Sequence, residues 1–340
     1  MKGAGGYRLY GMWGDYMSLG HDADCNEQLL CYMGQNTGCD EQLLYYLWLT
    51  SISGIGPATQ HMLLHAFGSP EGVYHAAESD LVKAGISPQR RELILSSHDT
   101  EEAVRILDRC HELGLFLITC RDEIYPDNLK DNPDLPILLY GRGKSELFRK
   151  DADLGIDMDQ KWQPFGPDYK PTELDWWWVN EPLIDFPNRR IAVIGARRCS
   201  QEDKEKCIAR VKRCGEENPG AIIISGGAKG IDGYAHTAAL KNGLRTIAFV
   251  GTGPDLSYPS EHTDLFDKIC EYGMILSEYP PGTKARPYHF PRRNRLIAAW
   301  SDEMYVIGAG RNSGTQSTVN YFREYHGEDN AEMVEVRNIH

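Results

Sequence analysis

Residues suited to binding phosphate follow each of five short apolar runs in the sequence. Arg197 and Arg198 come directly after the first run, and Lys229 follows the second. Glycines around them allow a backbone to approach a phosphate closely, and the basic side chains supply the opposite charge. The chemistry indicated is binding of a phosphate-bearing anion. The runs are 191–194, 221–224, 246–250, 274–276 and 304–307, and the segments after them are 195–200, 225–232, 251–259, 277–295 and 308–315.

The apolar runs have the composition of buried strands, and helix-length segments separate them. They predict an α/β fold: an extended Rossmann-like, doubly wound parallel sheet with helices on both faces. In such a sheet the carboxyl ends of the strands meet at one edge, where these folds bind their ligands. We call the five segments at this edge the crest. The helices that follow are expected to present free N–H groups to an anion there.

The crest does not fit the common nucleotide motifs. Segment 195–200 has one glycine and two arginines where a dinucleotide site needs GxGxxG, and no Walker A lysine motif occurs. The basic residues could together span more phosphates than one nucleotide offers, which favours a polymer. No catalytic residue, metal or cofactor is expected. The candidate contacts are Gly195, Arg197, Arg198, Ser225, Gly226, Gly227, Lys229, Gly251, Gly253, Arg292, Arg293, Asn294 and Arg295.

Some of these candidates have a second interpretation. The arginines of segment 292–295 could pair with Glu278 or Asp302 instead of a ligand. Asn294 could tie its loop to a neighbouring backbone.

Five further side chains near the crest carry chemistry. Asp232 and His236 are four residues apart on one helix face. We interpret them as a buried hydrogen-bonded pair and helix cap, because no nucleophile or metal set accompanies them. Tyr258 and Tyr288, with Phe290, could stack on nucleic-acid bases, or could pack in the core and anchor loops.

The net charge of −13 argues at first against a nucleic-acid partner. Its distribution weakens that argument, because residues 188–325 hold 20 Lys and Arg against 15 Asp and Glu. Charges beyond about 10 Å are largely screened at physiological salt, so a bound polyanion responds to the local field. A basic groove on this one domain is therefore compatible with the acidity of the whole chain.

The remaining segments differ in composition. Residues 41–120 show helical periodicity, and Gly54-Ile55-Gly56 resembles a helix-hairpin-helix turn, although a tight turn in a small bundle fits as well. Residues 151–187 hold nine Asp or Glu against two Lys, and suit a docking surface or a solvated loop. We predict a leader over 1–40, a helical (SAM-like) domain over 41–120, a connecting segment over 121–150, an acidic insertion over 151–187, a Rossmann-like domain over 188–325 and a tail over 326–340.

The composition of the chain indicates its cellular compartment. Nine cysteines contain no CxxC pair, and the first residues lack the apolar core of a secretory signal. No run of 18 or more apolar residues occurs, so no membrane span is expected. We expect a cytoplasmic protein with reduced thiols.

Three segments of the crest resemble the DNA-processing protein A (DprA, also Smf) family. They are Ser225-Gly-Gly-Ala-Lys-Gly-Ile-Asp-Gly-Tyr-Ala-His236, Ser277-Glu-Tyr-Pro-Pro-Gly-Thr283 and Phe290-Pro-Arg-Arg-Asn-Arg295, within a likeness that covers about 41–150 and 188–320. The resemblance implies a homodimer that binds single-stranded DNA, protects incoming strands and loads RecA in natural transformation and recombination. Arg197 matches the family's DNA-binding arginine, and Lys229 its phosphate-binding lysine. Ala196 and Gly227 depart from the usual Ser or Thr and the usual Leu.

The glycine-rich crest is also similar to that of cytokinin-type phosphoribohydrolases, which implies a nucleotide enzyme or sensor as the alternative. Those enzymes carry a catalytic glutamate after a Gly-Thr turn. Here the comparable position after Thr315 holds Thr318. The missing acid therefore favours a protein that binds DNA and is not an enzyme.

Overall fold

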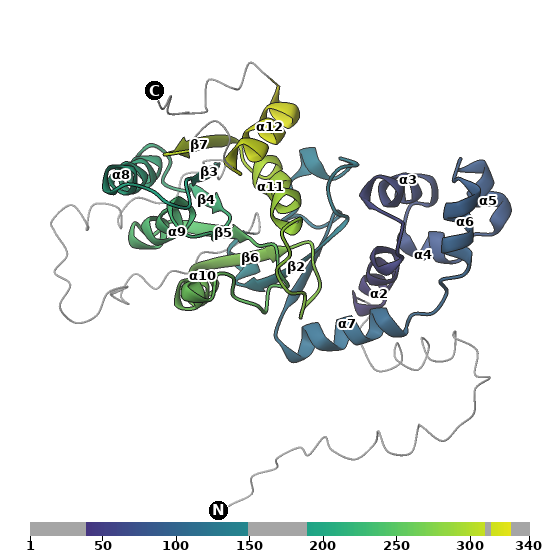
Figure 1. Ribbon diagram of the computed structural model, residues 1–340. Helices are drawn as coiled ribbons and strands as arrows, with labels where there is room; N and C mark the ends of the chain where they lie inside the picture. Colours follow the sequence, from purple (N-terminus) through teal and green to yellow (C-terminus); the bar gives the residue numbers. More distant parts are fainter. Residues whose placement is uncertain (1–38, 149–188, 310–313, 328–340) are drawn as a thin grey trace, which may run out of the picture.

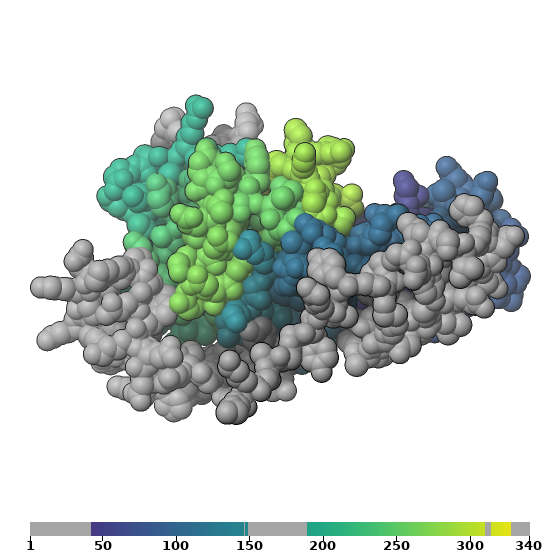
Figure 2. Space-filling model, turned by 90° about the horizontal axis from the view of Figure 1, so that it is seen from below, coloured from purple at the N-terminus to yellow at the C-terminus, as the bar shows by residue number. Residues whose placement is uncertain are grey.

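The computed structural model describes residues 39–148, 189–309 and 314–327 (Figure 1). The predicted leader, acidic insertion and tail fall largely or wholly outside these ranges. A helical part lies beside an α/β part, and in the space-filling view of Figure 2 its blue atoms extend to one side of the green atoms of the α/β part. Within the described ranges, none of the helices combines the length and the apolar character needed to span a membrane.

One seven-stranded sheet organises the α/β part, in the order β1-β2-β6-β5-β4-β3-β7. All neighbouring pairs among β3 to β7 are parallel, and these strands fall on the five apolar runs, which confirms the predicted parallel core. β1 and β2 extend it in antiparallel fashion, with Tyr140 of β2 opposite Ser277 of β6. The sheet is therefore mixed. The strands are β1 (Phe116–Thr119), β2 (Leu138–Gly143), β3 (Arg190–Gly195), β4 (Ile222–Ser225), β5 (Arg245–Phe249), β6 (Gly273–Ser277) and β7 (Glu303–Ile307).

Helices cover both faces of the sheet, as a doubly wound fold requires (Figure 1). Alternate side chains of β3 show the two faces: Ile191 packs with α8 and α9, whereas Ala192 packs in the cluster that holds α11 and α12. The chain runs from β3 to β6 in one direction and then returns to place β7 on the other side of β3. The order reverses there, and open α/β sheets bind ligands at such a reversal. The helices are α8 (Gln201–Glu217), α9 (Ile231–Lys241), α10 (Thr263–Tyr272), α11 (His289–Ala299) and α12 (Thr315–His326).

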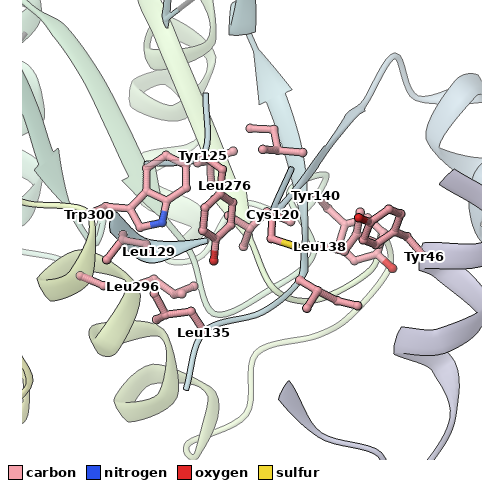
Figure 3. Packing of buried hydrophobic residues seen from close by; sticks show 14 of the residues in the cluster. Tyr46, Cys120, Tyr125, Leu129, Leu135, Leu138, Tyr140, Leu276, Leu296 and Trp300 are labelled. Atoms are coloured by element: carbon pink, nitrogen blue, oxygen red, sulfur yellow. The ribbon is translucent and has the colours of Figure 1, made fainter. Parts of the chain in front are cut away.

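The helical part shares its core with the sheet. Tyr46 of α2 is buried with Cys120 and Tyr140, and the same cluster continues to Tyr125 and Trp300, whose ring centroids are 5.4 Å apart (Figure 3). One continuous core therefore holds the two parts together. Gly54 to Gly56 form the turn between α2 and α3. The helices are α2 (Cys39–Ser51), α3 (Pro57–Phe67), α4 (Pro70–Tyr74), α5 (Glu78–Lys83), α6 (Pro88–Leu95) and α7 (Glu101–Glu112).

Candidate nucleic-acid interface

The first two segments of the crest lie against each other at the carboxyl ends of β3 and β4. Gly230 makes this contact possible: a Cβ there would lie 2.2 Å from the Ala196 carbonyl oxygen, and its φ of +84° suits glycine. The N–H of Ile231 donates to the same carbonyl at 3.2 Å. The backbone thus brings together the turns that carry Arg197 and Lys229, and both side chains are exposed.

Lys229 already has one charged neighbour. Its Nζ lies 2.5 Å from Oε1 of Glu261, which belongs to the short helix η5 (Ser260–His262). The hydrogen bond from Lys229 lowers the pKa of Glu261. Both side chains are more than half exposed, so the pair is weak and a phosphate can compete with the carboxylate for the lysine.

Arg293 is buried, with only 5% of its surface exposed. Its Nη1 donates to the carbonyls of Gly226 and Phe249, which join the ends of β4 and β5. A Cβ on Gly226 would lie 2.5 Å from the guanidinium, so glycine is needed beneath it. Burial lowers the pKa of Arg293 to about 10, which still leaves it charged at neutral pH. The expectation that Arg293 contacts a ligand directly is therefore corrected: it holds the crest in shape.

Asp232 lies buried beneath the crest and faces several of its N–H groups. The N–H of Ala228 donates to Oδ2 at 3.4 Å, and those of Gly195 and Gly226 also act on the carboxylate. Burial raises the pKa of Asp232, against the opposing effect of Arg293 and these N–H groups. An internal carboxylate thus occupies the place where the sequence predicts a ligand anion.

A second carboxylate closes the N-terminus of α8. Ser200 accepts from the N–H of Asp203 at 3.1 Å, and Asp203 Oδ2 accepts from the Ser200 N–H at 3.0 Å, which forms a capping box. The predicted cap at Ser200 is confirmed. The capping box thus satisfies the N–H groups of Ser200 and Asp203, two of the donors at this helix end. Fewer backbone donors therefore face a ligand at this helix end than the sequence predicts.

His236 is fully buried, and its partner is Thr246 rather than Asp232. Its Nδ1 lies 2.8 Å from Thr246 Oγ1, whose hydroxyl donates to the Ile223 carbonyl at 2.8 Å. Thr246 must therefore accept from His236, which places the histidine proton on Nδ1. The expected hydrogen bond between Asp232 and His236 is absent, although both residues are buried as predicted.

Burial of His236 predicts a loss of stability in mild acid. It lowers the pKa of this histidine from 6.5 to about 3. The folded state therefore stays neutral while the unfolded chain takes up a proton, and stability that is complete above pH 6.5 is lost as the pH falls toward 3. Between about pH 7.5 and about pH 5 we expect wild type to lose about 2 kcal/mol more than His236→Gln. Denaturant unfolding at both pH values measures this, and identical losses would contradict it. Because His61 and Asp232 titrate in both proteins, the comparison isolates His236.

The other predicted residues of segment 292–295 fall into two classes. Glu278 accepts two hydrogen bonds from Arg292, at 2.7 and 3.1 Å, and one from Arg295 at 2.7 Å. Arg295 is 3% exposed and is structural, a correction to its predicted contact, whereas about half of the Arg292 side chain faces solvent. Asn294 donates to the Gly314 carbonyl at 3.3 Å, in agreement with the expectation of a loop tie. Asp302 pairs with Arg190 instead.

Three predicted polar and glycine positions shape the turns. Ser225 is fully buried and donates to the Val193 carbonyl at 2.7 Å, so its predicted contact is corrected. Gly251 packs beneath the ring of Phe290, and Gly253 lies where a Cβ would meet the Pro280 carbonyl at 2.6 Å. Among the predicted contacts that the structure describes, four basic side chains are exposed along the crest: Arg197, Arg198, Lys229 and Arg292.

The three aromatic residues considered from the sequence differ in solvent exposure. Phe290 is half-buried, whereas Tyr258 is 51% exposed and Tyr288 60% exposed. The Arg197 guanidinium lies 5.8 Å from the centre of the Phe290 ring. Exposed rings beside exposed arginine are typical of surfaces that bind single-stranded nucleic acid.

The fold and the crest together define a Rossmann-like protein with exposed basic side chains at the carboxyl ends of its strands. Residues 180–329 match the DNA recombination-mediator protein A family. The chain is 36% identical over 197 residues to DNA processing protein DprA of Streptococcus pneumoniae, covering 58% of this chain and 55% of the relative. It is 30% identical over 282 residues to protein Smf of Synechocystis, covering 82% and 62%. It therefore spans less than two thirds of the length of these relatives, and residues 180–329 carry the domain of the DprA/Smf family.

A solved structure supports the same assignment. The X-ray structure of DprA from Streptococcus pneumoniae aligns with a TM-score of 0.57 and 26% identity, over 83% of this chain and 82% of that chain. The resemblance predicted from the crest segments is thus confirmed at the level of the family.

Proposed function

We propose that this protein binds single-stranded DNA along the crest and does not act as an enzyme. The observation that carries the proposal is the row of exposed basic side chains at the carboxyl ends of the strands, with Arg197 and Lys229 on adjoining turns. A binding site built mostly from solvent-facing cations recognises phosphates without regard to base sequence.

The placement of these cations favours a strand over a single nucleotide. Asp232 accepts from the N–H of Ala228 and Asp203 from that of Ser200, which leaves fewer backbone donors to enclose one phosphate. The exposed charges lie instead on three separate segments of the crest, which suits successive phosphates of a polymer. Membership of a family described as DNA recombination-mediator and DNA processing proteins supports DNA as the polymer.

Three finer elements of the proposal rest on the family alone. They are protection of incoming strands, loading of RecA in transformation and recombination, and assembly as a homodimer. Cytoplasmic location, proposed from the reduced cysteines, agrees with these roles.

Strand preference tests the proposal. At low salt the protein should bind a single-stranded oligonucleotide of about 30 nucleotides at least tenfold more tightly than the duplex of the same sequence. Fluorescence anisotropy with a labelled strand measures both affinities, and the label alone serves as control. Equal or tighter binding of the duplex, or no binding of either, would rule the proposal out.

A further inference from the structure

Aromatic rings from two segments of the crest form a cluster beside Arg197. The rings of Tyr258 and Phe290 lie 5.3 Å apart at an angle of 34°. Arg197 lies over Phe290 at 5.8 Å, within reach of a cation–π contact. One of the exposed cations is therefore in contact with an aromatic surface.

His289 fixes the orientation of this cluster. It is buried, its Nδ1 lies 2.8 Å from the Gly251 carbonyl, and its ring stacks on Tyr279 at 3.9 Å. The adjoining Tyr288 meets His289 edge-on, with ring centroids 4.6 Å apart, and points outward. The anchored histidine thus presents Tyr288 and Phe290 from a rigid helix start.

The large rings of Tyr258 and Tyr288 face solvent instead of packing in the core. They are the two most exposed tyrosines among the large apolar side chains that face solvent in the described residues. The hydroxyl of Tyr288 accepts from Arg286 at 3.1 Å, which adds a second exposed cation beside the rings. Charge and ring face together complement a strand that offers phosphates and unstacked bases.

We propose that Tyr258 and Tyr288 are base-stacking residues that select single strands over duplex. This inference rests on the proposed function, since it concerns the same strand. A duplex covers the faces of its bases by stacking them on one another, whereas a single strand can place bases on protein rings. The cations bind either form, so the rings supply the discrimination.

An abasic strand tests the stacking directly, because it keeps every phosphate and removes every base. We expect wild type to bind an oligothymidylate of about 30 nucleotides more tightly than the abasic strand of equal length, by roughly 5- to 150-fold for each stacked base. Tyr258→Leu and Tyr288→Leu should each lose that factor on oligothymidylate and bind the abasic strand as wild type does. Tyr258→Phe and Tyr288→Phe should retain it.

Tyr272 provides a matched control, since it is exposed but lies at the amino end of β6, on the opposite edge of the sheet. Tyr272→Leu should leave both affinities unchanged, and equal melting temperatures confirm that the variants fold. Equal binding of the two strands by wild type would overturn the stacking proposal while the proposed function stands. Equal weakening of both strands in the leucine variants would also overturn it. Failure to bind either strand would reject the proposed function itself.

Discussion

Arg197→Ala and Lys229→Ala are each expected to weaken binding of a single-stranded oligonucleotide by about tenfold. Each substitution removes one charge-assisted hydrogen bond to phosphate, worth about 1.5 kcal/mol at the low end of its range because these side chains are exposed. Both side chains lie on turns that pack together, so the two effects should combine along one strand. Anisotropy titrations at constant low salt measure the effect.

Two further variants sharpen this prediction. Arg213→Ala removes an exposed arginine at the far end of α8, away from the crest, and should leave the affinity unchanged. Glu261→Gln removes the carboxylate that pairs with Lys229 and should raise the affinity. A decrease with Glu261→Gln, or equal weakening by Arg213→Ala and Arg197→Ala, would contradict the assignment of these side chains to the strand.

Arg293→Met is expected to destabilise the fold by about 2–6 kcal/mol, because it leaves two buried carbonyls without their donor at a cost of about 1–3 kcal/mol each. The guanidinium satisfies the carbonyls of Gly226 and Phe249 and balances the buried carboxylate of Asp232. Methionine cannot donate to either carbonyl and leaves Asp232 without its nearby positive charge. Denaturant unfolding gives the change in free energy.

A double substitution separates charge from packing. Arg293→Met with Asp232→Asn should cost less than the sum of the single changes, because the second removes the charge that the first leaves unbalanced. Arg292→Met, in the same helix but half-exposed, should change the stability by less than about 1 kcal/mol. Strict additivity, or equal destabilisation by Arg292→Met and Arg293→Met, would show that the buried charge is unimportant.

The parallel core and its ligand edge could be predicted from the sequence because both are local signals. An apolar run followed by glycine marks a buried strand and its turn, and parallel topology brings the turns together without further information. The place of β1 and β2 could not be predicted in this way. The pairing of β2 with β6 places Tyr140 opposite Ser277, and nothing in either local sequence specifies so distant a partner.

The burial of Arg293 and Arg295 is also invisible in the sequence, where they resemble their exposed neighbour Arg292. Tertiary partners decide the difference: strand-end carbonyls bind Arg293, and the largely buried Glu278 binds Arg295. The carboxylate at α8, in contrast, has a readable signal. Ser200 followed three residues later by Asp203 is a capping-box spacing, which indicates that two donors of this helix end are already satisfied.

The positions of these side chains change the kind of ligand that the proposed site suits. Internal acids accept from several backbone donors at the crest, and its exposed part presents cations and aromatic rings. Such a surface suits a flexible strand better than a compact ligand.

The salt dependence of strand binding tests the central claim most directly. Affinity for oligothymidylate should be measured across a salt series for wild type and for the Arg197→Ala/Lys229→Ala double variant. We predict a linear fall of log K with log salt in wild type, and a slope flatter by roughly 1.4 in the double variant, about 0.7 for each phosphate that the variant no longer neutralises. Equal slopes in the two proteins, or a wild-type affinity that does not respond to salt, would contradict the account.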